Sequence, residues 1–336
     1  MADSANVRTV WAEDIVYNTF AATLFLQTFY QGWQSLFDNA RTARLPVLDS
    51  NITVDYPADA DALAQAPAFS TAELVGYEWS RELVRATKQV NLRKTAEAGG
   101  GSMLDAQANM ELAVEMGIGV DQKFLGKIAG LNYVEVTNAN VTGAGNLVEA
   151  GDANTLSRSL PYRPASVAAE NAILESFETL ANVLGLKHLV PGQGQFTGSQ
   201  QPGVAVYHGS IPVVNMLVRR LADEKVLQSP SDIGAQALID QRLPGGMVAY
   251  KGRAYGTDIC ANPAIRPPTA GDWHNYVYPA NSTLVGGFSV LGISDSTFAD
   301  GNTGGRYVNE RTSIGIYQFG APRPNHVIRH TIKGAV

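Results

Sequence analysis

The sequence has few of the features on which the commonest functional classes depend. A single cysteine, Cys260, excludes an intrachain disulfide and a metal site made of several cysteines. No apolar run approaches the roughly 18 residues that a membrane-spanning helix requires. The opening residues, MADSANVRTV, lack the cationic and apolar regions of a secretory signal peptide, so we do not expect secretion by that route. With 25 Lys and Arg against 31 Asp and Glu, the 336-residue chain has a net charge of −6, which argues against general binding of nucleic acids.

Motifs of catalysis and cofactor binding are also missing. The glycines from Gly99 to Gly101 are not followed by the Gly-Lys-Ser/Thr of a phosphate-binding loop, and those of residues 191–198 lack the dinucleotide-binding spacing. Ser210 does not lie in a Gly-X-Ser-X-Gly turn. His326 and His330 share only one side of an expected strand, which does not make a metal site. We therefore predict no enzyme activity, no cofactor and no metal.

The most informative segment that is present runs from residue 40 to residue 131. A strand pattern from Ala43 to Tyr56, an acidic tip and a second strand pattern from Leu74 to Lys94 predict a long β-hairpin. Pro46 is typical of an edge strand. Neither arm has enough large apolar residues to bury a core of its own, so the ribbon must lie on something else. A neighbouring subunit is the favoured support, which makes an assembly protein the first hypothesis.

A long amphipathic helix is predicted directly after the hairpin, over residues 102–131, with Ser102 as its N-cap. At ~1.5 Å per residue it spans roughly 40 Å. Its apolar face repeats at spacings of three and four residues and comprises Ala106, Met110, Ala113, Gly117, Val120, Phe124, Ile128 and Leu131.

The remaining segments predict a mixed α+β fold. The first forty residues are dense in aromatics and form either an arm that docks on another protein or a helix of the chain's own core. A second helix is expected after Ser166, and residues 191–304 alternate short strands with short helices. Two closing strands, Thr312 to Phe319 and Val327 to Ile332, are predicted to pair antiparallel around the sequence GAPRPN. Strands that return at the end indicate a discontinuous domain.

The hairpin has an uneven distribution of charge. Five acids and no Lys or Arg lie between Asp49 and Glu73, whereas the returning arm is rich in bases. An acidic tip and a basic stem are complementary between copies, which predicts an intersubunit contact; a ribbon whose charges are only solvated is the alternative. The candidate contact residues are Asp55, Asp59, Asp61, Arg81, Arg85, Lys88 and Arg93.

Three stretches, in the order in which these parts occur, carry a resemblance to a known family: GYEWSRELVRATKQVNLRK, GGGSMLDAQANMELAVEMG and GAPRPNHVIRHTIKG. The chain resembles the major capsid protein of tailed bacteriophages, whose HK97-like fold is shared by encapsulin shells. The resemblance implies an N-terminal arm (1–39), an extended loop (40–99) and a spine helix (102–131). It also implies a peripheral domain (100–190 and 305–336) and an axial domain (191–304).

The same resemblance implies a structural protein of the virion that assembles in the host cytoplasm. Hexamers and pentamers of the chain then tile an icosahedral shell around double-stranded DNA, which is held non-specifically. A portal protein is an implied partner, and a decoration protein is a further one in some shells. Because no long charged segment precedes the hairpin, we expect a separate scaffolding protein. Two alternatives stay open: an encapsulin-like nanocompartment shell, and an intracellular α+β enzyme with an unrecognised site.

Overall fold

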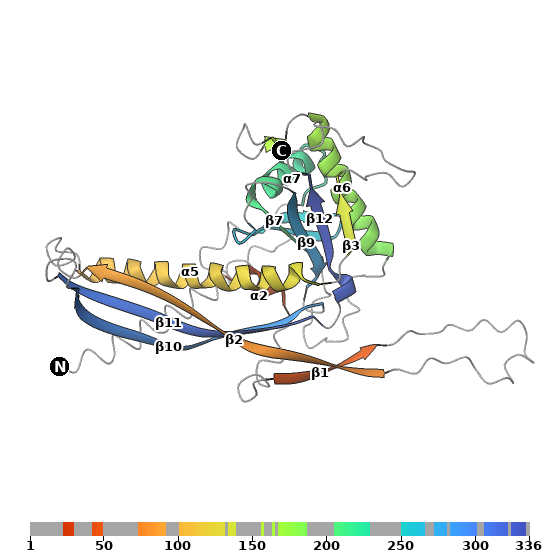
Figure 1. The fold of residues 1–336 in the computed structure, drawn as a ribbon. Helices are drawn as coiled ribbons and strands as arrows, with labels where there is room; N and C mark the ends of the chain where they lie inside the picture. The colour runs from red at the N-terminus through yellow and green to blue at the C-terminus, as the bar shows by residue number, and fades with distance from the viewer. Residues whose placement is uncertain are drawn as a thin grey trace, which may run out of the picture.

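The computed structural model describes residues 23–29, 42–49, 73–91, 101–131, 134–138, 156–157, 163–164, 167–186, 205–228, 250–265, 272–280, 283–300, 306–321 and 324–333. They form two parts (Figure 1). One is an elongated pair of layers, a four-stranded sheet along which a long helix lies, which we call the slab. The other, which we call the body, is a six-stranded sheet with two helices. The predicted α+β class is confirmed.

The slab is an antiparallel sheet in the order β1-β2-β11-β10, with α5 (Gly101–Ala129) along one face (Figure 1). Its strands are β1 (Thr42–Asp49), β2 (Glu73–Asn91), β10 (Val285–Asp300) and β11 (Arg306–Gly320). β1 is an edge strand, as Pro46 predicted. In Figure 1, β1 and the first part of β2 project away from α5 as a two-stranded ribbon.

The second half of β2 corrects one expectation about the hairpin. Residues 73–80 pair with β1, but residues 81–91 pair with β11 of the same chain. On the same stretch, Val84 and Ala86 pack against the apolar cluster under α5. The chain itself therefore supports this half of the returning arm, whereas at the β1 end none of the described strands adds a third strand to the ribbon.

The apolar face predicted for the long helix is correct in its C-terminal half and wrong at Met110. Ala113, Val120, Phe124 and Ile128 are fully buried, whereas the Met110 side chain is 58% exposed. The buried half of α5 covers the aromatic part of the sheet. The N-terminal half packs on β2 only through a small cluster that joins Leu112, Ala113 and Ala86. The predicted stripe continues past the point where the sheet offers an apolar surface.

The body is a six-stranded sheet in the order β3-β12-β9-β6-β8-β7, parallel at β12/β3 and β6/β8 and antiparallel elsewhere. α6 (Val167–Leu186) packs on β12 and β3, and α7 (Ile211–Asp223), with Pro212 in its first turn as predicted, packs on β8 and β7. The strands are β3 (Val134–Thr137), β6 (Ala205–Gly209), β7 (Tyr250–Ala254), β8 (Thr257–Ala261), β9 (Trp273–Pro279) and β12 (Ile328–Ile332). A separate short pair joins β4 (Leu156–Ser157) to β5 (Arg163–Pro164).

The predicted pairing of the two closing strands is wrong. β11 lies in the slab between β10 and β2, whereas β12 lies in the body between β3 and β9. The Pro-rich connection, which contains the 3₁₀ turn Pro324–His326, carries the chain from one sheet to the other instead of folding it back.

The body sheet also joins segments that the sequence analysis assigned to different domains. β3 and β12 come from the ranges expected for the peripheral domain, and the other four strands come from 191–304. β10, from the range expected to be axial, lies in the slab. The division into domains itself stays a prediction.

The N-terminal region is described only at residues 23–29, which contain the short helix α2 (Leu24–Thr28). Phe25, Leu26 and Phe29 are buried in a cluster that also contains residues of α5, β9, β10 and β11. These residues belong to the chain's own core, as one of the two interpretations of this region held. The rest of 1–39 lies outside the described residues.

Candidate functional site

The sheet of the slab has one face covered by α5 and one that the described residues leave open. Along β2, Glu82, Val84 and Ala86 are half-buried, whereas Leu83, Arg85 and Thr87 are exposed. Successive side chains of a strand point to opposite faces. The antiparallel register places residues 316, 314 and 312 of β11 beside 83, 85 and 87. We call this set the open face: Leu83, Arg85, Thr87, Thr312, Ile314 and Ile316.

The open face is largely apolar and carries the positive charge of Arg85. Leu83 is 71% exposed, the largest exposure among the big apolar side chains described, and it lies beside the half-buried Ile316. Arg85 is exposed, and no described residue forms a hydrogen bond or an ion pair with it. The hydroxyls of Thr87 and Thr312 lie 3.2 Å apart and so satisfy each other. An apolar patch beside an unpaired guanidinium suits a protein surface that carries apolar and acidic side chains.

The structure places only some of the residues predicted for an intersubunit contact. Arg85 lies on the open face, where the predicted basic surface requires it. Arg81 and Lys88 belong to β2, at the register positions of Gln318 and Arg311. The acidic candidates Asp55, Asp59 and Asp61, together with Arg93, lie outside the described residues, so the acidic half of the contact stays a prediction.

The opposite, inner face of the sheet is fastened to α5 by a polar tie. Glu82 of β2 accepts hydrogen bonds from the Lys127 ammonium of α5 and from the Tyr317 hydroxyl of β11. These two donors, Lys127 first, lower the pKa of the Glu82 carboxyl. The tie keeps α5 in place over β2 and β11 and leaves their other face open.

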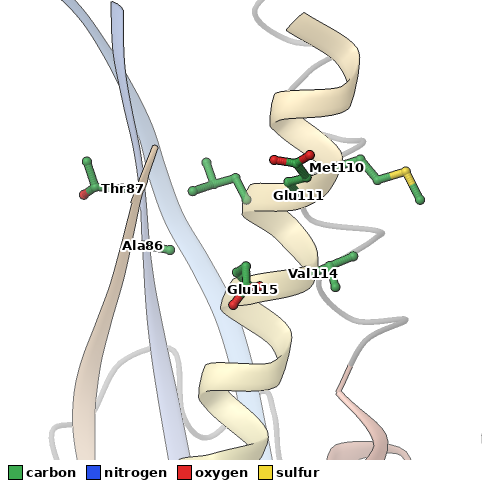
Figure 2. Close-up of a pocket in the computed structure, with 7 residues that line it drawn as sticks. Ala86, Thr87, Met110, Glu111, Val114 and Glu115 are labelled. Atoms are coloured by element: carbon green, nitrogen blue, oxygen red, sulfur yellow. The ribbon is translucent and has the colours of Figure 1, made fainter. Parts of the chain in front are cut away.

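A shallow pocket of ≈ 420 Å³ separates β2 from the N-terminal half of α5 (Figure 2). In Figure 2, Ala86 points toward the helix and Thr87 away from it, while Met110 and Val114 point away from the strands. The remaining lining residues are Glu111, Leu112 and Glu115. These seven lining residues include no nucleophile paired with a base, and the pocket lies where α5 packs only loosely on β2.

One group of side chains contains a Ser–His pair, as hydrolases do, but it is inaccessible and its third member is a tyrosine instead of a carboxylate. Ser176 Oγ lies 2.7 Å from His330 Nε2, and Tyr207 Oη lies 2.9 Å from His330 Nδ1. The Ser176 hydroxyl donates to the carbonyl of Ile173, so Nε2–H must donate to Ser176 and the Tyr207 hydroxyl must donate to Nδ1. All three side chains are fully buried, and burial lowers the pKa of His330 to about 3. The chain of hydrogen bonds joins α6, β12 and β6 and serves the core.

The described residues are distinguished by the shape of the fold rather than by catalytic or metal-binding groups. Among them, no group of three or more His, Cys, Asp or Glu side chains is arranged to hold a metal ion. No helix in this part of the chain is long and apolar enough to cross a membrane. What remains is a two-part α+β subunit with an elongated slab, a projecting ribbon and an open apolar face.

Solved structures that are similar to this chain come from phages and related shells. A structure from Mycobacterium phage Che8 has a TM-score of 0.53 at 11% identity, over 92% of this chain and 90% of that chain. The capsid of cyanophage P-SCSP1u gives 0.48 at 12% identity over 93% and 89%, and a virus-like particle from Pyrococcus furiosus gives 0.46 at 9% over 95% and 96%. No protein-family model matches the sequence, and no curated protein is similar to it. At 11% identity the similarity to the Che8 structure is one of fold, and it agrees with the predicted resemblance to proteins of tailed phages.

The sequence analysis missed several residues that define this geometry. Leu83, Ile314 and Ile316 were not singled out, because β2 and β11 have apolar residues on both faces and periodicity does not say which face α5 covers. Asp121 gave a signal that was overlooked. It stands four residues after Gly117 and three before Phe124, within the apolar stripe of α5, where an unpaired carboxylate does not belong.

Proposed function

We propose that this chain is the structural subunit of an icosahedral capsid, in which hexamers and pentamers enclose phage double-stranded DNA. The fold similarity to the Mycobacterium phage Che8 structure, which extends over nine-tenths of both chains, supports the proposal. The architecture supports a mechanical role rather than catalysis, because its distinctive surfaces are an open sheet face and a projecting ribbon. The proposed location is the virion.

The observation that carries the proposal is the exposure of Leu83 on a sheet face that nothing described covers. Burial of a leucine side chain contributes about 1.5–3 kcal/mol relative to exposure. An isolated chain lacks this contribution, whereas each copy in a shell would gain it by burying Leu83 against a neighbour. The half-buried Ile314 and Ile316 add to the same surface.

The proposed occupant of the open face is the acidic tip of the hairpin of a neighbouring copy. Residues 50–72 contain Asp55, Asp59 and Asp61 and no Lys or Arg, together with apolar side chains such as Phe69. This composition complements Leu83 and the unpaired Arg85. Each exposed charge pair contributes only about 0.2–1 kcal/mol, so the apolar contact supplies the affinity and the charges select the register.

The direct test of this surface is Leu83→Glu, with Val167→Glu as the matched control. Val167 is 67% exposed on α6 of the body, so both variants place a charge at an equally open apolar position. We expect Leu83→Glu to yield folded subunits that sediment as small species, while Val167→Glu retains the large species of the unmodified chain. Equal behaviour of the two variants in sedimentation velocity contradicts the assignment of the open face as a contact.

The contents of the particles separate the capsid proposal from an encapsulin-like compartment. Particles isolated from phage-infected cells should protect genome-length DNA from nuclease. Particles that hold a protein cargo and no DNA would instead support a nanocompartment.

A further inference from the structure

Residues 23–29 lie at the junction between the slab and the body. The Phe29 ring contacts Phe124 of α5 at a centroid distance of 5.0 Å, Phe319 of β11 at 5.8 Å and Tyr278 of β9 at 6.2 Å. The Phe25 ring lies against His208 of β6 at a centroid distance of 4.6 Å, tilted by 35°. This seven-residue segment, α2 with its two flanking residues, thus contacts both sheets and the long helix.

A buried carboxylate of α5 holds the start of this segment. Asp121 is 1% exposed; its Oδ2 accepts from the Leu24 amide at 2.8 Å, and both of its oxygens lie 3.3 Å from the Phe25 amide nitrogen. The local N-cap, Thr23, makes no side-chain capping bond. The first turn of α2 is therefore capped from another helix. The pairing is mutual, because these amides are the hydrogen-bond donors that make burial of the carboxylate tolerable.

The hydroxyl of Thr28, which forms three hydrogen bonds, holds the end of the segment. Thr28 Oγ1 donates to the Phe25 carbonyl at 2.7 Å, so it must accept from the Tyr278 hydroxyl at 2.7 Å and from His208 Nε2 at 3.2 Å. His208 is therefore the Nε2–H tautomer, and its Nδ1 has no partner. Tyr278 and His208 belong to the body, whereas Asp121 belongs to the slab, so the polar contacts of the segment reach both parts.

Sterics fix how deeply the segment sits. A Cβ built on Gly286 of β10 would lie 2.5 Å from Cδ2 of Phe29, so the ring rests directly on the strand backbone. The body, in contrast, has a complete core without this segment. Its apolar cluster contains residues of α6, α7 and the six-stranded sheet but none of residues 23–29, α5, β10 or β11.

We propose that residues 23–29 are a removable wedge that sets the angle between slab and body, with Asp121 as the positioning residue that seats it. While the wedge is seated, its contacts join the two parts into one rigid unit. When it leaves, the body keeps its own core and the slab keeps its strand pairing. The contacts of Tyr276 and Tyr278 of β9 with the slab remain, but they no longer fix the angle between the two parts. This inference concerns the single chain and does not depend on shell assembly.

The test uses the full chain, kept below the concentration at which it assembles, and two variants that act from opposite sides. Asp121→Asn leaves one oxygen to accept from two amides, and Gly286→Ala displaces Phe29 without touching Asp121. Glu115→Gln is the control, because it removes an exposed carboxylate from the same helix. Hydrogen exchange of the amides of residues 23–29 measures whether the segment stays in place. Electron–electron distances between two spin labels measure the angle between slab and body. The spin labels are placed at Leu83→Cys and Val167→Cys in a Cys260→Ala background.

We expect both variants to speed exchange within residues 23–29 by about tenfold or more, as the loss of a hydrogen bond implies, with β8 unchanged. The distance distribution between slab and body should broaden in both variants and stay narrow in the control. Equal acceleration in β8 would mean that the segment is an ordinary part of a single cooperative core, and it would overturn the proposal. A distribution that stays narrow after residues 23–29 are released would overturn it as well.

Discussion

At the scale of single residues, the buried histidines link subunit stability to pH. Burial lowers the pKa of both His208 and His330 to about 3, against about 6.5 for an exposed histidine. The unfolded chain takes up a proton at each below pH 6.5, and the folded chain does not. Their contribution to the free energy of unfolding is therefore complete above pH 6.5 and is lost as the pH falls toward 3.

We predict that each of these two histidines lowers the free energy of unfolding by about 2 kcal/mol between pH 7 and pH 5. Burial raises the pKa of Asp121, which acts in the opposite sense, so the comparison is made between variants. His330→Phe should lower stability at pH 7 and flatten the pH dependence by about 2 kcal/mol. Phe177→Leu, which alters the packing on Tyr207 and removes no titrating group, should keep the full slope. Urea unfolding of unassembled subunits measures both, and identical slopes would refute the assignment.

Replacing two glycines of the slab with alanine should have opposite effects on stability. A Cβ on Gly315 of β11 would lie 2.6 Å from both Met116 Cε and Phe288 Cε2, whereas one on Gly119 of α5 meets nothing within 4 Å. Gly315→Ala should therefore destabilise the subunit by about 1–3 kcal/mol through overpacking. Gly119→Ala should stabilise it by about 1 kcal/mol through helix propensity. Shifts of the unfolding midpoint in the same direction for both would show that α5 does not pack on β11 as described.

At the scale of elements, the local sequence pattern predicted the features that depend only on neighbouring residues. The long helix, Pro46 at a sheet edge and the helix start at Pro212 each follow from spacing or from one residue's chemistry. Pairing between distant strands does not follow from local pattern, because many strands share the same alternation of polar and apolar residues. The partner of β11 is β2, more than two hundred residues away, and the partner of β12 is β3. Leu83 was unpredictable for the same reason, since its face is defined by where α5 lies.

The ribbon gives a prediction about charge at this scale. Reversing Asp59 and Asp61 to Lys should slow or misdirect assembly, because a positive tip no longer complements Arg85 on the open face. Reversing Arg85 to Glu in the same chain should partly restore it. Both effects should weaken with added salt, since the pairs are exposed. Light scattering during assembly measures the rate, and a double reversal no faster than either single one would show that these charges are only solvated.

At the scale of the whole molecule, the two-part shape suits the proposed role in a shell. The body has a core of its own, and the slab offers a covered face, an open face and a projecting ribbon. None of the described residues covers Leu83 or adds a third strand beside β1, so under the proposed function these surfaces become buried against other copies. Its stability should therefore rise with concentration.

The most direct measurement is negative-stain electron microscopy of the expressed, unmodified chain. The proposed function predicts closed, hollow particles of uniform diameter that contain many copies, formed by the chain alone or with a scaffolding protein. Leu83→Glu should abolish them under the same conditions. A monodisperse small oligomer that binds a small molecule and never closes into a particle, with or without scaffold, would contradict the account and favour the enzyme alternative.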